Sequence, residues 1–206
     1  MAAPKPVVIN ANVPVSANPH SWLVLLGHPA EATGPRCMTG TLRPTYRERV
    51  NTAASFAAAK LLIGIGEEAA PWRPGAYRHE VVLPREADDR YADPQLLFAD
   101  IDAAHVATGK ALLGYVTLTW TPERLHHQWR VAHALAAELV DTFDVPVMLV
   151  QHCPGLVASS AVPHCHLLLG CRTLTGIGWG GYVAALNGDR LWPLVRERFD
   201  ALLASL

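Results

Sequence analysis

Two histidines separated by one residue, His164 and His166, stand at the head of an apolar run and constrain the fold more than any other feature of the chain. Successive side chains of a β-strand point to opposite faces, so both imidazoles would project from one face and Cys165 from the other. The next residues, 167–169, are three leucines, which is typical of a central strand covered by helices on at least one face. The pattern therefore predicts a buried strand that presents two imidazoles side by side.

A third histidine, His152, follows the apolar run 145–150, which predicts a neighbouring strand that carries one more imidazole to the same face. Three neutral imidazoles without a nearby carboxylate cluster suit Mn, Zn, Ni, Co or Fe(II) and hold Mg less tightly. Three ligands leave coordination positions open, as a catalytic ion needs, whereas a structural zinc site is usually closed by four. His152, His164 and His166 are therefore the candidate metal ligands. The alternative is that each is an ordinary core or surface histidine.

Length and composition indicate one domain over residues 1–206, with residues 76–206 carrying the histidine motif and residues 1–75 forming a divergent N-terminal part. No run of eighteen apolar residues occurs, and the N-terminus lacks the apolar core of a secretory signal. We therefore expect a cytoplasmic protein with no membrane partner. The four cysteines include no CxxC pair, so we expect reduced thiols without a catalytic role.

The formal net charge of −1 gives no global support for a nucleic-acid partner, which normally leaves a basic footprint. The charge is nevertheless uneven, because residues 36–60 are mainly basic and residues 85–102 mainly acidic. The basic stretch indicates a locally basic face, although a charge run is commonly only a solvated surface.

Hydrophobic periodicity predicts helices over 52–63, 93–106, 121–143 and 189–206, with Asn51 capping the first and Thr121 the third. Strands are predicted over 79–83 and 112–120, in addition to the two that carry the histidines. The glycine-rich residues 175–181 are predicted to form a turn, since they lack the lysine of a phosphate-binding loop. The order of strand, helix, two strands and helix predicts an α+β fold, with a small, mainly antiparallel sheet and helices packed on one face.

Residues 79–183 resemble the MobA/MobL group of plasmid mobilisation relaxases, members of the HUH endonucleases that nick single-stranded DNA. The resemblance depends on HEVVLPRE (79–86), on residues 127–152, and on PHCHLLLGCRTLTGIGWGGYV (163–183). In that family the last segment typically reads PHxH, an apolar run, then an arginine and a glycine-containing turn. Pro163, both histidines and the leucine run match this pattern here.

The resemblance implies that His164 and His166 are paired ligands and His152 the third, on a divalent ion such as Mn²⁺ or Mg²⁺, or else Zn²⁺. The ion would hold the scissile phosphate while a tyrosine hydroxyl attacks it, giving a 5′-phosphotyrosine and a free 3′ hydroxyl. Arg172 could contact the same phosphate, or be a surface arginine at a strand end. The implied partners are single-stranded DNA and accessory mobilisation proteins, and the implied role is nicking at a plasmid transfer origin for conjugative mobilisation.

The nucleophile is where the chain departs from the family pattern. Members usually present it near the N-terminus, in a Ser, Arg, Gly and Ala-rich segment that ends in Tyr-Arg, and the first forty residues lack this segment. Tyr46, followed by Arg47, is the nearest equivalent and the predicted nucleophile. Tyr77, followed by Arg78, is a second candidate that runs directly into a predicted strand. If neither serves, the protein would be a metal- and DNA-binding relative without nicking activity.

Two other classes of protein are compatible with these residues. HIT-type nucleotide hydrolases and transferases also carry alternating histidines after a strand, but they need a nucleophilic histidine at the third alternating position, where this chain has Leu168. A noncatalytic metal-binding or interaction domain would use the histidines to hold zinc for stability.

Overall fold

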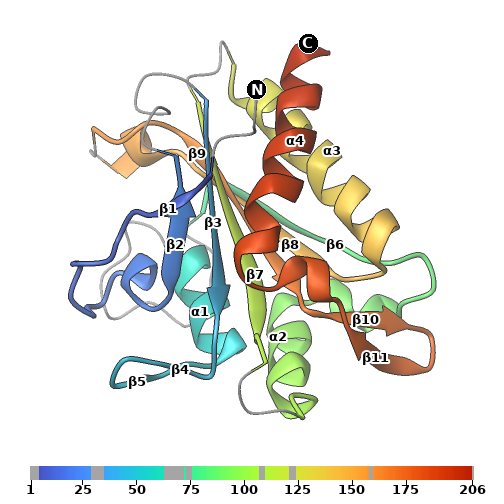
Figure 1. Ribbon diagram of the computed structural model, residues 1–206. Coiled ribbons are helices and arrows are strands. Elements are labelled where there is room, and N and C mark those ends of the chain that lie inside the picture. The colour runs from blue at the N-terminus through green and yellow to red at the C-terminus, as the bar shows by residue number, and fades with distance from the viewer. Residues whose placement is uncertain are drawn as a thin grey trace.

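A seven-stranded sheet forms the centre of the computed structural model, which describes residues 5–28, 35–62, 72, 76–106, 110–120, 124–157 and 160–205. The strand order is β1-β2-β3-β7-β9-β8-β6, and every neighbouring pair is antiparallel (Figure 1). The strands are β1 (Val7–Val8), β2 (Val24–Gly27), β3 (Arg36–Leu42), β6 (Arg78–Val82), β7 (Leu113–Thr119), β8 (Val147–His152) and β9 (His164–Gly170). The predicted α+β class with a mainly antiparallel sheet is confirmed.

The described part of the chain also contains two hairpins, four α-helices and several short 3-10 helices. The hairpins pair β4 (Thr45–Tyr46) with β5 (Arg49–Val50), and β10 (Arg172–Thr175) with β11 (Gly178–Tyr182). The helices are α1 (Ala53–Leu61), α2 (Pro94–Ala103), α3 (Leu125–Phe143) and α4 (Leu191–Ala204). None of these helices is long and apolar enough to cross a membrane.

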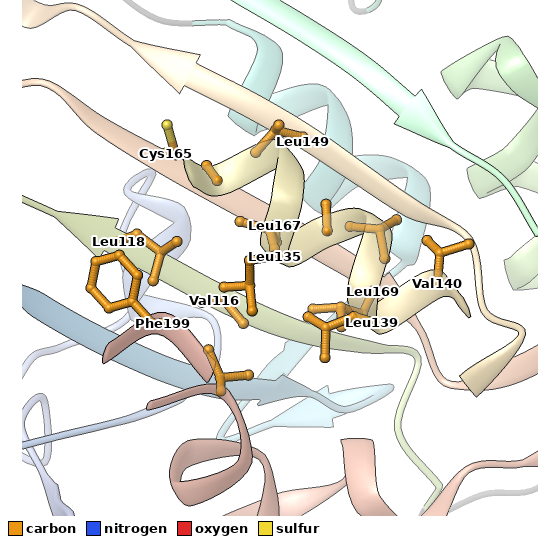
Figure 2. Packing of buried hydrophobic residues seen from close by; sticks show 14 of the residues in the cluster. Val116, Leu118, Leu135, Leu139, Val140, Leu149, Cys165, Leu167, Leu169 and Phe199 are labelled. Carbon is orange, nitrogen blue, oxygen red and sulfur yellow. The ribbon is translucent and has the colours of Figure 1, made fainter. Parts of the chain in front are cut away.

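Helices α3 and α4 cover one face of the sheet, as Figure 1 shows. The stripe of α3 places Leu135 and Leu139 against Leu167 and Leu169 of β9, and Phe199 of α4 closes the cluster beside β7 (Figure 2). All five side chains are fully buried. This is the packing that the helical period of residues 125–143 predicts, because the apolar side chains recur on one side of the helix.

Helices α1 and α2 cover the opposite face, so helices lie on both faces of the sheet rather than on one. Phe56 of α1 and Phe98 of α2 are fully buried in a second cluster with Tyr115 of β7 and Leu168 of β9. Leu168 points to this face, whereas its neighbours in β9 point to the other. The uninterrupted leucine run is therefore explained by burial on both sides.

Several predicted boundaries differ in detail. The N-cap of α1 is Thr52, whose hydroxyl accepts from the Ser55 amide, while the side-chain amide of Asn51 donates to the carbonyls of Trp22 and Arg43. Residues 64, 66, 121 and 122, predicted as helix stops and starts, lie outside the described residues.

The glycine-rich residues 175–181 form the turn and second strand of the β10–β11 hairpin, where Gly178 has a φ of 112° that favours glycine. The sequence pattern does not predict β3, because its residues alternate in neither polarity nor size. The strand forms by pairing along its whole length with β7.

Candidate metal centre

The three histidines meet at one end of the sheet, on the face covered by α1 and α2. In the antiparallel register of β8 and β9, His152 stands directly opposite His164, so both side chains share a face. His166 follows two residues later in β9 and therefore points to the same face. The predicted convergence of His152, His164 and His166 is present.

The spacing of the rings suits a single ion. The ring centroids are 5.1 Å apart for His152 and His164, 4.6 Å for His152 and His166, and 4.8 Å for His164 and His166. One nitrogen from each ring can serve as a ligand, and these three nitrogens all lie within 4.8 Å of one another. The cluster could therefore hold a metal ion, with His152 and His166 buried and His164 half-buried.

Hydrogen bonds to protein groups engage the other nitrogen of each ring. His152 Nε2 donates to the Lys60 carbonyl at 2.7 Å, and His164 Nδ1 donates to the Val162 carbonyl at 2.9 Å. These bonds leave His152 Nδ1 and His164 Nε2 with free lone pairs, which is the form a metal ligand needs. Partners of this kind fix the tautomer and orientation of metal-bound histidines.

His166 is fixed by hydroxyl groups of the neighbouring strand. Its Nδ1 lies 2.8 Å from Tyr115 Oη and 3.0 Å from Thr117 Oγ1. Thr117 pairs with His166 across β7 and β9, and Tyr115 lies two residues away on the same face. Tyr115 Oη also lies 2.6 Å from Nε2 of His20, a fourth histidine whose ring centroid is 5.7 Å from that of His166. His166 is thus held between the prospective ion and a buried hydroxyl network.

Burial keeps these imidazoles neutral. It lowers the pKa of His152 to about 4, although the hydrogen bond to the Lys60 carbonyl acts in the opposite direction. Burial, followed by the charge of Lys60, lowers the pKa of His20 to about 3 and that of His166 well below the ordinary value. The pKa of His164 shifts in the same direction, mainly through burial. Neutral imidazole is the ligand form, so the site is prepared to bind a cation across the neutral and mildly acidic range.

A buried lysine accompanies the histidines. Lys60 lies in the last turn of α1 with 4% of its surface exposed, and burial lowers its pKa to about 7. Its ammonium lies 4.8 Å from the ring centroid of Tyr115 and 5.4 Å from that of Phe56. Among the described residues, no carboxylate or hydrogen-bond acceptor contacts this ammonium.

The structure does not bring Tyr46 to the histidines. β3 runs away from the cluster. Met38 of β3 pairs with Thr117 of β7, which in turn pairs with His166 of β9, so Met38 is level with the cluster. The strand ends at Leu42, about 13 Å from Met38 at 3.3 Å per residue. Tyr46 follows in the β4–β5 hairpin at the far end of the sheet (Figure 1). There it lines a separate cavity of about 170 Å³.

Arg172 is also remote from the histidines, since it lies beyond the far end of β9. Its guanidinium donates to the carbonyls of Gly180 at 2.8 Å, Trp179 at 3.2 Å and Ala104. These bonds tie the β10–β11 hairpin to the end of α2. In this position Arg172 contacts backbone carbonyls, and its predicted contact with a phosphate stays a prediction.

The sequence pattern did not identify Lys60, Tyr115, Thr117 or His20 as members of this environment. Tyr115 and Thr117 carried a usable signal, because polar groups alternate there in an otherwise apolar strand and so face one side. Lys60 carried a second signal, since it follows the buried Phe56 by one helical turn and so lies on the apolar side of α1. His20 lies in a segment without periodicity and carried none.

No family model and none of the curated proteins matches the chain. A solved structure described as the "Molecular Basis of Vancomycin Resistance Transfer in Staphylococcus aureus" is similar to it, with 18% identity and a TM-score of 0.52. The likeness covers 63% of this chain and 68% of that chain. At this identity the likeness concerns the fold alone. The protein therefore combines an α+β fold, similar to that of this solved structure, with a three-histidine cluster that could hold a metal ion.

Proposed function

We propose that this protein is a metal-dependent, relaxase-like endonuclease that nicks single-stranded DNA through a covalent tyrosine–DNA intermediate. A plasmid transfer origin would be its target and conjugative mobilisation its role, in which accessory mobilisation proteins would take part. The proposal depends above all on the three imidazoles that converge with their outer nitrogens already engaged. The relaxase-like fold and the resemblance of residues 79–183 support it.

Three imidazole ligands favour Mn²⁺ over Mg²⁺, with Zn²⁺ as a further candidate. Such an ion, when bound, would use its open positions to neutralise charge on the phosphoryl oxygens. The protein's own contribution is to hold three neutral ligands in fixed orientations. The half-buried His164 stands nearest to the solvent side of the cluster, so we place the substrate phosphate beyond it.

The geometry favours Tyr77 over Tyr46 as the nucleophile. The amide of Tyr77 donates to the carbonyl of Gln151 at 3.1 Å, and the next residue, Arg78, pairs with Gln151 in the sheet. Tyr77 therefore lies beside His152 at the edge of the sheet that carries the cluster. Its side chain is 53% exposed, which leaves it accessible to a DNA strand.

The proposed reaction is an in-line transesterification. The Tyr77 oxygen forms a bond to phosphorus and its proton passes to solvent. The bond between phosphorus and the 3′ oxygen breaks, and that oxygen takes up a proton. The products are a 5′-phosphotyrosine on the protein and a free 3′ hydroxyl on the DNA.

The test is to mix the protein with Mn²⁺ and a labelled pool of single-stranded DNA and to look for a covalent band on a denaturing gel. We expect the band with the wild type and with Tyr46→Phe, and its loss in Tyr77→Phe and His164→Ala. A band that persists in His164→Ala would refute the metal-dependent mechanism. A band lost in Tyr46→Phe but kept in Tyr77→Phe would refute the role of Tyr77 alone.

The HIT-type alternative is disfavoured by the position of Leu168. This residue occupies the third alternating position of β9, where that mechanism needs a histidine, and it is fully buried among apolar side chains. If Mn²⁺ binds but no variant or wild-type sample forms a covalent band on cognate DNA, the protein is instead a metal-binding relaxase relative without nicking activity.

A further inference from the structure

Lys60 presents an electrostatic problem that the histidine cluster alone does not explain. The side chain is almost completely buried, and no described carboxylate or acceptor contacts its ammonium. A charge in such a poorly hydrated position is costly, and a lowered pKa is the usual consequence, as it is for Lys60. The charge of Lys60 also contributes to the lowered pKa of all four histidines, His20, His152, His164 and His166.

Metal binding would make this problem more acute. A divalent cation on the three histidines would stand near a second positive group in a poorly screened environment, and like charges repel strongly there. Both cations become compatible when an anion lies between them. An anion at the open side of the metal would therefore favour the charged form of Lys60 as well as the bound ion.

Two structural features tie Lys60 to this centre. Its backbone carbonyl accepts the hydrogen bond that orients His152, so its main chain is part of the ligand support. Its ammonium lies over the Tyr115 ring, and the hydroxyl of that ring contacts His166. Its side chain and main chain therefore both adjoin the cluster, in contrast to a lysine that merely shields an apolar surface.

We propose that the Lys60 ammonium is an anion-binding group of the metal centre and contacts a non-bridging oxygen of the phosphodiester bound there. The inference rests on the proposed function and names a further residue that acts on the substrate. Lysine is well suited to this role, because its ammonium is a compact point charge that binds phosphate oxygens. The anion would be shared by the metal and the lysine.

The test compares Lys60→Met, which keeps the length of the side chain without its charge, with Lys110→Met as a matched change at an exposed lysine. Mn²⁺ affinity is measured by calorimetry, first alone and then with dimethyl phosphate, a singly charged phosphodiester. Without phosphate, Lys60→Met should bind Mn²⁺ tighter by roughly threefold or more, because a repelling charge is gone.

With dimethyl phosphate present, the wild type and Lys110→Met should bind Mn²⁺ tighter than without it, by roughly tenfold. Lys60→Met should lose most of this coupling, and Lys60→Arg should keep part of it. Circular dichroism and urea unfolding check the fold. We expect Lys60→Met to be as stable as the wild type or more so, because an unpaired buried charge is removed.

The outcomes separate this inference from the proposed function. Coupling that depends on Lys60, in a protein that never forms a covalent adduct with DNA, would uphold the anion site and overturn the nicking function. Adduct formation with unchanged coupling in Lys60→Met would uphold nicking and overturn the role of Lys60. A Lys60→Met protein that is folded but binds Mn²⁺ more weakly, without phosphate, would also overturn it, since a repelling charge cannot strengthen metal binding.

Discussion

The free energy of unfolding of the metal-free protein should fall steeply between about pH 6.5 and pH 4, because its buried histidines resist protonation. The pKa of His152 is about 4 in the folded protein and 6.5 in an unperturbed chain, so within this window the unfolded state binds more protons. Its stabilising contribution is complete above pH 6.5 and is lost by about pH 4. This difference in pKa corresponds to about 3 kcal/mol in the free energy of unfolding. His20, His164 and His166 act in the same direction.

Urea unfolding at pH 7.5, 6.0 and 5.0 in the presence of a chelator measures this effect. A buried neutral histidine contributes a slope of up to about 1.4 kcal/mol per pH unit. His152→Gln should therefore flatten the pH dependence by roughly that amount at pH 5–6. His127→Gln, on the surface of α3, leaves the cluster intact and serves as the matched control. Equal slopes for the wild type and His152→Gln would refute the argument that His152 is held neutral by burial.

Three further predictions concern the packing around the site. Leu139→Ala should lower the free energy of unfolding, measured with urea, by about 2–5 kcal/mol, because this side chain of α3 is fully buried against the sheet. Gly40→Ala should lower the free energy of unfolding by about 1–3 kcal/mol in the same assay, because the added Cβ would clash with a leucine methyl and a backbone carbonyl. Gly181→Ala is the control: its Cβ would meet nothing within 4 Å, so stability should change little. Arg172→Met should lower the free energy of unfolding by about 1.5–3 kcal/mol, because it leaves backbone carbonyls unpaired. Its Mn²⁺ affinity, measured by calorimetry, should be unchanged.

The parts of the fold that could be predicted are those whose own sequence carries a period. The stripe of α3 and the alternation of β9 each determine which face is buried, and they correctly place His164 and His166 together. The second covered face was harder to predict, because α1 is rich in alanine and shows no strong polar side. Phe56 and Lys60 share its buried face, and a lysine there reads from the sequence as an interruption of an apolar run.

Only part of the candidate site could likewise be predicted from local sequence. The candidate metal ligands follow from strand alternation, which is a local property. The groups that hold them come from β7, α1 and the segment before β2. Lys60 and His152 are joined by a hydrogen bond between residues 92 positions apart in the chain. No spacing rule connects such residues, so their role became visible only when the sheet and helices were assembled.

Strand direction determines which tyrosines lie near the candidate metal centre. In this antiparallel sheet, the end that carries the histidines is formed by the last residues of β8 and the first residues of β9 and β6. A segment that follows β3 or β9 emerges at the opposite end, so Tyr46 and Tyr182 are remote whatever their local sequence resembles. Tyr91 and Tyr115 are buried, and Tyr115 is committed to His166. Tyr77, just before β6, is exposed and lies at the end of the sheet that carries the histidines. This position, more than the arginine that follows it in the sequence, makes Tyr77 the residue to test first.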